Sequence, residues 1–236
     1  MSHFLISLAT YNERENLPLI TREIFEVAPD ADILVIDDNS PDGSGDWVAE
    51  QMQTEPRLKL LRRPGKLGLG TATLAAMQYA IENGYDFLLN MDADLSHPPR
   101  YIPAIRTKTE ESGADIVIGS RYVSGGGVEG WPFYRQLMSR SINFYAKIFL
   151  GLKTKDNSGA FRCYRVGLLK KLKTETIISK GYSFQEEILY RLRKLGATFA
   201  EVPIIFVDRR FGSSKINHKE TLTALWILFR IGIFGG

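Results

Sequence analysis

The sequence has few of the residues and patterns that mark specialised classes of protein. Its single cysteine, Cys163, excludes an internal disulfide and is compatible with a reducing compartment. No hydrophobic run reaches transmembrane length, because the apolar tail at 222–236 contains Arg230 and would span only about 22 Å as a helix, against a hydrocarbon core of roughly 30 Å. The tail therefore predicts an interfacial, partner-docking or core helix.

Strong charge and common ligand motifs are missing as well. The net charge of +3 argues against a dedicated nucleic-acid binder. The three histidines lack zinc spacing, and neither a Gly-x-x-x-x-Gly-Lys-Ser/Thr phosphate loop nor a Gly-x-Gly-x-x-Gly helix start occurs. Basic residues are concentrated in 162–173 and 191–219, where they can face anionic lipid or a phosphorylated substrate.

Apolar strand-like runs alternate with helical patterns over the first 120 residues. This alternation predicts βαβ units, and so an α/β fold with a mostly parallel sheet flanked by helices. Ligands of such sheets bind at the carboxyl ends of the strands. We expect strands at 3–9, 32–37, 57–61, 86–91, 114–119 and 198–207, and helices at 14–27, 44–53, 69–83, 98–111, 133–151, 164–172, 184–195 and in the tail.

Two carboxylates stand at the end of the apolar run 87–91. Asp92 and Asp94 are two residues apart, so a strand sends them to one face and they can converge beyond its end. Their charges repel, and a hard cation such as Mg²⁺ or Mn²⁺ removes that repulsion while leaving positions for phosphate oxygens. A second acidic strand end, Asp37 with Asp38, precedes this one. Together they indicate a nucleotide diphosphate held through a metal.

Polar and basic turns supply further candidates. The turn at 10–13 can stack on a base and bond its edge, or it can simply begin the next helix. The glycine-rich segment 64–71 is either a weak anion site or loop geometry. Planar guanidinium groups beside small turn residues can clamp phosphate. The residues of that kind are Arg121, Arg135, Arg140 and Arg209, with Lys215 nearby.

A phosphatase is the alternative from another class of enzyme. Asp-x-Asp-x-Ser after an apolar strand, as in 92–96, is also the nucleophile signature of haloacid-dehalogenase-like phosphatases. That signature normally lies on the first strand of its domain, whereas here other strand–helix units precede it.

From end to end, the chain resembles the inverting family 2 glycosyltransferases of GT-A fold, and within them the polyprenol (dolichyl) phosphate mannosyltransferases. Ala9 departs from the proline that often precedes the first motif, and Ser96 replaces a glutamine that some relatives use as a metal ligand. The resemblance is carried by 10–16, 37–43, 91–98, 119–122, 131–140, 156–164, 181–185 with Glu187, 201–204, and Arg209 with Gly212, Ser214 and Lys215.

The resemblance implies inverting transfer of mannose from GDP-mannose to a polyprenyl phosphate, with Mg²⁺ or Mn²⁺ as cofactor. Another sugar, such as glucose from UDP-glucose, is the near alternative. One GT-A domain over 1–236 would bind the nucleotide sugar with 1–120 and the acceptor with 121–236. The implied metal contacts are Asp92, Asp94 and Ser96, and the implied nucleoside contacts are Thr10, Tyr11, Glu13, Asp37 and Asp38. The acceptor phosphate would contact Arg121, Arg135, Ser139 and Arg209, and Lys215 would contact the diphosphate or the acceptor. The implied catalytic residues are Asp94, Arg121, Arg135 and Arg209.

The acceptor of such enzymes is a membrane lipid, although this chain shows no membrane span. Some relatives of this short type rely on a small membrane-anchored subunit. The resemblance therefore implies peripheral attachment at the cytoplasmic face of a membrane and no nucleic-acid partner. The residues expected to contact the membrane are Trp226, Ile227, Leu228 and Phe229.

Overall fold

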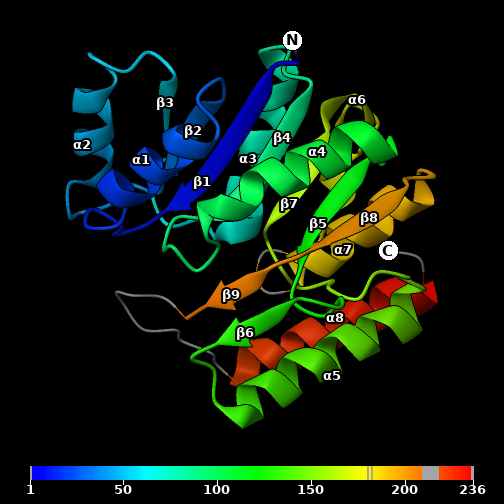
Figure 1. Cartoon of the computed structure of the whole chain (residues 1–236). Coiled ribbons are helices and arrows are strands. Elements are labelled where there is room, and N and C mark those ends of the chain that lie inside the picture. Colours follow the sequence, from blue (N-terminus) through cyan, green and yellow to red (C-terminus); the bar gives the residue numbers. More distant parts are fainter. Residues whose placement is uncertain (1, 180, 182, 209–217, 235–236) are drawn as a thin grey trace.

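A seven-stranded sheet forms the centre of the computed structural model, which describes residues 2–179, 181, 183–208 and 218–234 (Figure 1). Its members are β1 (Phe4–Thr10), β2 (Asp32–Asp37), β3 (Leu58–Arg62), β4 (Phe87–Asp92), β5 (Ile116–Ser120), β7 (Arg162–Arg165) and β8 (Phe199–Pro203). They lie in the order β3-β2-β1-β4-β7-β5-β8. β7 runs antiparallel to β4 and β5, and the other neighbouring strands are parallel, which confirms the predicted α/β fold.

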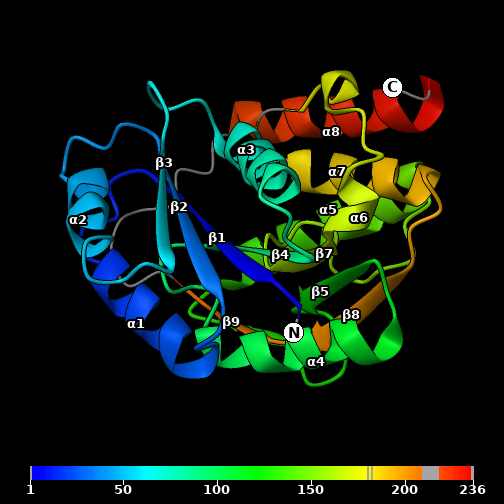
Figure 2. The ribbon, with the colours of Figure 1, turned by 90° about the horizontal axis from the view of Figure 1, so that it is seen from above.

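Helices cover both faces of this sheet (Figure 2). One core lies between the sheet and the helices α1 and α4, and a second lies against α3, α5, α6, α7 and α8. Successive strand residues alternate between these two cores, as Leu5 and Ile6 do. The helices are α1 (Leu17–Val27), α2 (Ser44–Gln51), α3 (Leu69–Glu82), α4 (Ile102–Ser112), α5 (Phe133–Leu150), α6 (Val166–Leu169), α7 (Phe184–Lys194) and α8 (His218–Phe234), with short 3₁₀ turns at Pro99–Tyr101 and Thr174–Thr176.

The elements predicted for the first 120 residues are confirmed with ends shifted by a few residues, as are the helices predicted at 133–151, at 184–195 and in the tail. Two other elements of the second half depart from the prediction. The helix expected at 164–172 is wrong at its start, because Arg162–Arg165 forms β7 between two other strands. The strand expected at 198–207 is interrupted at Ile204. Its second part, β9 (Ile205–Val207), leaves the main sheet and pairs with β6 (Gly127–Glu129), which was not predicted.

The tail helix α8 packs along α5 (Figure 1). The rings of Phe149 and Phe229 lie 5.5 Å apart, and a Cβ atom at Gly232 would collide with the Phe149 carbonyl, so the two helices approach closely there. Leu228 is buried in this contact, while Trp226 is exposed. Within the described ranges, no helix combines the length and apolar character that a membrane crossing requires.

Candidate active site

The carboxyl ends of three parallel strands bring the predicted acidic motifs to one edge of the sheet. In the register of the sheet, Thr10 lies beside Asp37 and Ala9 lies beside Asp92. Asp38 follows directly, and its backbone N–H donates to the Thr10 carbonyl at 3.1 Å. The convergence expected from the sequence is therefore present.

A tight turn after β4 fixes the second carboxylate of the Asp92/Asp94 pair. Ser96 donates its backbone N–H and its hydroxyl to Asp94 Oδ1, at 3.1 and 2.5 Å. Leu95 between them takes a positive φ of 64°, which is unfavourable for a leucine, and its buried side chain helps to hold that conformation. The Ser96 hydroxyl, expected at a metal position, orients Asp94 in this structure.

His97 also holds this turn in place. Its Nδ1 accepts the backbone N–H of Asp92 at 3.1 Å, and its ring packs between Phe161 and Phe206. Burial lowers the pKa of His97 to about 4, only partly opposed by the charge of Asp94. The imidazole is therefore neutral at physiological pH, as an acceptor at Nδ1 requires, and it fixes the end of β4.

The donor set at this edge fits a hard divalent cation. Asp92 is partly exposed, with 31% of its side chain accessible, and Asp94 stands two residues beyond it. Across the described residues, no third His, Cys, Asp or Glu joins them in a cluster of three. Mg²⁺ is commonly bound in this way, by one or two carboxylates together with water and phosphate oxygens. A structural zinc site would need four protein ligands.

The predicted nucleoside residues lie around the ends of β1 and β2. The ring of Tyr11 is partly exposed under the Lys66 ammonium group, 4.6 Å from the ring centroid. Buried Asp37 accepts the backbone N–H of Ser40 at 3.3 Å. Glu13 accepts from Asn16 Nδ2 at 2.6 Å. An aromatic face and several acceptors therefore border one surface, although their contact with a nucleoside stays a prediction.

Asp38 holds the glycine-rich segment rather than pointing alone into solvent. Its Oδ1 accepts from Arg63 Nε at 2.6 Å, and its Oδ2 accepts the backbone N–H of Leu67 at 3.1 Å. Arg63 also donates to Thr71 at 2.8 Å. This network fixes 64–71 beside Tyr11, so the carboxylate predicted as a nucleoside contact already has two protein partners.

Arg121, directly after β5, is locked in a buried ion pair. Its Nε and one terminal nitrogen donate to the two oxygens of Asp156, both at 2.7 Å, and it also donates to Ser158 at 2.9 Å. The guanidinium lies 5.4 Å from the ring centre of Trp131. Burial alone would lower the pKa of Arg121, but the charge of Asp156 raises it above its ordinary value. The pair is therefore a fixed positive group at the strand end.

The other predicted acceptor residues lie on or near α5. Arg135 donates to both oxygens of Asp208, at 3.1 and 3.3 Å, and stacks 4.2 Å from the Trp131 ring. The Ser139 hydroxyl accepts from the hydroxyl of Tyr122 at 2.7 Å. Arg209 and Lys215 lie outside the described residues.

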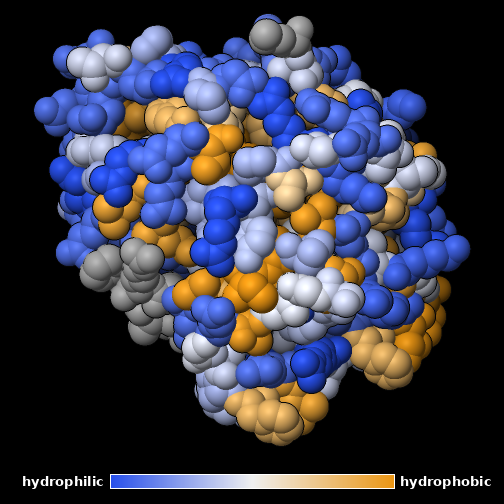
Figure 3. Space-filling view, viewed as in Figure 1, coloured by the Kyte–Doolittle hydropathy of each residue, from blue (hydrophilic) through white to orange (hydrophobic). Residues whose placement is uncertain are grey.

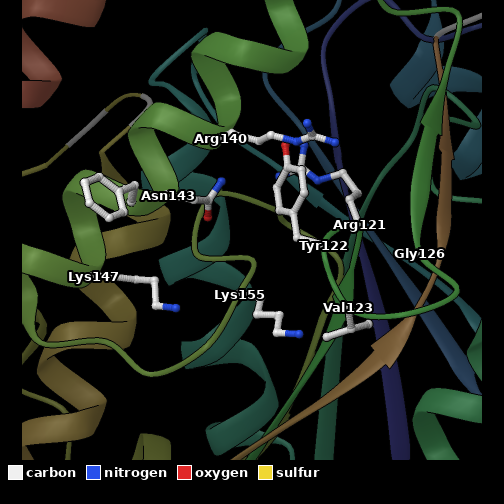
Figure 4. Close-up of a pocket in the computed structure, with 9 residues that line it drawn as sticks. Arg121, Tyr122, Val123, Gly126, Arg140, Asn143, Lys147 and Lys155 are labelled. Carbon is white, nitrogen blue, oxygen red and sulfur yellow. The ribbon is translucent and has the colours of Figure 1, made fainter.

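An open groove of about 500 Å³ lies between α5 and the segment after β5 (Figure 4). Arg140, Lys147 and Lys155 line it, and none of the three forms an ion pair with another residue in the described part of the chain. Arg140 reaches towards Arg121 and Tyr122, and the two lysines lie farther along the groove (Figure 4). The groove can thus attract an anion beside the buried Arg121.

Comparison with known proteins identifies the family. The model for glycosyl transferase family 2 matches residues 6–173. The chain belongs to glycosyl transferase family 2. An undecaprenyl-phosphate mannosyltransferase from Micrococcus luteus is 42% identical over 217 residues, which cover 90% of this chain and 87% of the relative. A polyprenol monophosphomannose synthase from Mycolicibacterium smegmatis is 39% identical over 232 residues, which cover 98% and 87%. The resemblance found in the sequence is confirmed.

Solved structures give this family 2 chain the expected GT-A fold. A mannosyltransferase from Pyrobaculum calidifontis in complex with GDP-mannose and Mn²⁺ matches with a TM-score of 0.62 and 16% identity, over 94% of this chain and 60% of that one. A glucosyl-3-phosphoglycerate synthase from Mycobacterium tuberculosis, with Mn²⁺, UDP and phosphoglyceric acid, matches with a TM-score of 0.69 and 15% identity, over 99% and 78%.

The sequence did not predict which residues pair with the candidate site residues of this glycosyltransferase. Arg63, Asp156 and Asp208 fix Asp38, Arg121 and Arg135, respectively. Asp156 lies in a turn of short polar residues, a composition typical of exposed loops, yet its side chain is completely buried.

Proposed function

We propose that this chain transfers mannose from GDP-mannose to a polyprenyl phosphate, with inversion at the anomeric carbon and with a divalent metal. The observation that carries the proposal is the identity of 42% and 39%, along nearly the whole chain, to an undecaprenyl-phosphate mannosyltransferase and a polyprenol monophosphomannose synthase. GDP-mannose and Mn²⁺ in a solved protein of the same fold support the donor and the cofactor. The phosphatase alternative finds no support, since the chain is a family 2 member.

The amino half provides the donor side of the proposed reaction. Asp92 and Asp94 would hold Mg²⁺ or Mn²⁺ against the diphosphate, and Tyr11 would face the nucleoside. When bound, the metal supplies charge neutralisation for the departing diphosphate. The turn held by Ser96 and His97 fixes both carboxylates beforehand, so little reorganisation is needed during transfer.

The second half provides the acceptor side. A phosphate monoester has a second pKa of about 6 and is largely ionised at neutral pH, so its oxygen can attack without a dedicated base. Arg121 is held rigidly by Asp156, and Arg140 borders the same groove, so a phosphate entering there meets fixed positive charge. Attack from this side, opposite the diphosphate, would invert the anomeric carbon.

The surface of α5 supports an acceptor with an apolar tail. Four exposed residues at spacings of four, seven and four form one stripe along the helix: Phe133, Leu137, Phe144 and Ile148. Figure 3 shows hydrophobic side chains protruding along the lower edge of the molecule, over α5. Arg140 and Lys147 are seven residues apart and line the groove beside that stripe. Adjacent apolar and cationic surfaces fit a phosphorylated lipid at a membrane surface, and so peripheral attachment.

The test is transfer of radiolabelled mannose from GDP-mannose to a polyprenyl phosphate, with Mn²⁺ or Mg²⁺ and with EDTA. We expect metal-dependent label in the lipid phase. Asp92→Asn should lower the rate by about 10³-fold or more, since metal charge stabilisation is worth several kcal/mol. Asp46→Asn, on the exposed side of α2, is the matched control and should leave the rate unchanged. If label is transferred from UDP-glucose and not from GDP-mannose, the donor is UDP-glucose. If neither donor gives labelled lipid, the proposal is overturned.

A further inference from the structure

Buried polar atoms without partners gather at the start of α7. Gln185 is 4% exposed, and neither its amide oxygen nor its amide nitrogen has a hydrogen-bond partner among the described residues. Glu186 Oε2 and Arg162 Nε are equally buried and likewise lack a partner in that part of the chain. Folded proteins pair the great majority of such atoms, so a group of four in one place requires an explanation.

The sheet places this group on the face towards which Asp92 points. Arg162 lies opposite Asn90 in the pairing of β7 with β4, and Asn90 and Asp92 are two residues apart on β4. All three side chains therefore share one face, the face covered by α3 and α7. The Arg162 guanidinium donates to the Gln185 carbonyl at 2.7 Å, which fixes the first turn of α7 above β4 and β7.

The same group adjoins the buried Arg121–Asp156 pair. Arg162 donates a second hydrogen bond to the carbonyl of Asn157 at 2.6 Å, one residue from Asp156. Burial raises the pKa of Glu186 to about 7, and Arg162, Asp156 and Arg121 are the charges that act on it. The unpartnered atoms thus share a face of the sheet with Asp92, proposed for the donor diphosphate, and adjoin the ion pair that holds Arg121, proposed for the acceptor phosphate.

We propose that Gln185 and Glu186 bind hydroxyl groups of the transferred sugar and so determine which hexose the enzyme accepts. This inference rests on the proposed function, in which a sugar bridges those two phosphate sites. An amide, like a protonated carboxyl group, both donates and accepts hydrogen bonds, as a sugar hydroxyl does. A hexose with a misplaced hydroxyl would leave these buried groups unpaired, and a site of that kind discriminates strongly.

The experiment compares binding of GDP and of GDP-mannose, each with Mn²⁺, by titration calorimetry. Gln185→Leu should leave the affinity for GDP unchanged and weaken GDP-mannose by about tenfold, the loss expected for one or two hydrogen bonds. The same variant should lower the preference in kcat/KM for GDP-mannose over GDP-glucose by about tenfold. Its unfolding temperature should stay constant or rise, because leucine removes unpaired polar atoms from a buried place.

Three further variants make the result decisive. Glu186→Leu removes the carboxyl group and should also weaken GDP-mannose selectively, whereas Glu186→Gln keeps a donor and an acceptor and should bind GDP-mannose nearly as wild type does. Thr21→Val is the matched control, since it removes a buried hydroxyl from α1, on the opposite face of the sheet. Equal losses for GDP and GDP-mannose, or a selective loss in Thr21→Val, would overturn the inference. A wild-type protein that binds neither ligand would overturn the proposed function instead.

Discussion

The contacts that orient the site residues differ between its two halves in the sequence separation of the partners. In the amino half, Asp94 is oriented by Ser96 and Asp37 by Ser40, two and three residues away. In the second half, Arg121 is 35 residues from Asp156, and Arg135 is 73 residues from Asp208. The first arrangement is local and forms with the turn itself. The second exists only when distant segments have packed, so its charges are tied to the stability of the fold.

Burial distinguishes individual ion pairs rather than the two halves, because the Arg63–Asp38 pair of the amino half is also buried, with side chains 9% and 8% exposed. The Arg121–Asp156 pair is 7% and 0% exposed, whereas the Arg62–Asp46 pair at the edge of the amino half is 50% and 79% exposed. Their closest distances are almost equal, at 2.7 and 2.6 Å. If burial rather than distance sets the contribution of an ion pair, the two pairs should respond very differently to removal of one charge.

The largest effect is expected for Asp156→Asn, which keeps the shape of the side chain and removes its charge. It leaves the buried Arg121 guanidinium without compensation and should lower the free energy of unfolding by about 3–5 kcal/mol. Urea denaturation at pH 7 measures it. In the double variant Arg121→Met/Asp156→Leu, much of the stability should return, because neither charge is then buried alone. A single-variant loss below about 1 kcal/mol would mean that burial does not distinguish the Arg121–Asp156 pair from the Arg62–Asp46 pair.

A smaller effect, with a defined pH dependence, is expected for Glu186→Gln. Burial raises the pKa of Glu186 from 4.5 to about 7, so the folded state binds its proton more tightly than the unfolded state. Its favourable contribution is complete below pH 4.5 and is lost as the pH rises through 7. The variant should therefore gain stability relative to wild type between pH 5 and 8, by on the order of 3 kcal/mol. Urea denaturation of both proteins at pH 5 and pH 8 measures this difference. The same difference between Glu186→Gln and wild type at the two pH values would contradict the prediction.

Sequence patterns predicted the amino half well, because its information is local. Alternating runs gave β1, β2 and β4, and the same-face spacing of Asp92 and Asp94 gave the acidic edge of the sheet. The orientation of Asp94 by Ser96 was not predicted, since a serine beside two carboxylates serves equally as a ligand or as a hydrogen-bond donor. The pairing of Asp38 with Arg63 was not predicted either, because the two residues are 25 positions apart in the sequence.

In the second half, the helices at 133–151 and 184–195 were predicted correctly, but the strand β7 and the buried ion pairs were not. Residues 162–165 carry two arginines and resemble a helix start, yet pairing with β4 and β5 makes them a strand. Nothing in the local sequence shows that Arg162 is fully buried or that Asp156 meets Arg121. These outcomes depend on tertiary packing, which no short window of residues contains. The resemblance to family 2 named several of these positions, but only the fold shows what they contact.

The smallest effect is expected for Asp46→Asn, which breaks the exposed pair with Arg62. Solvent screens both partners, and two long side chains lose freedom when they form the pair, so the net contribution is about 0.2–1 kcal/mol. The free energy of unfolding should fall by no more than that amount at low salt, and the difference should shrink as ionic strength rises. When Asp46→Asn and Asp156→Asn are measured in the same denaturant series, the experiment compares two ion pairs with almost equal N···O distances. A loss of several kcal/mol here would show that distance, not burial, sets the strength of ion pairs in this molecule.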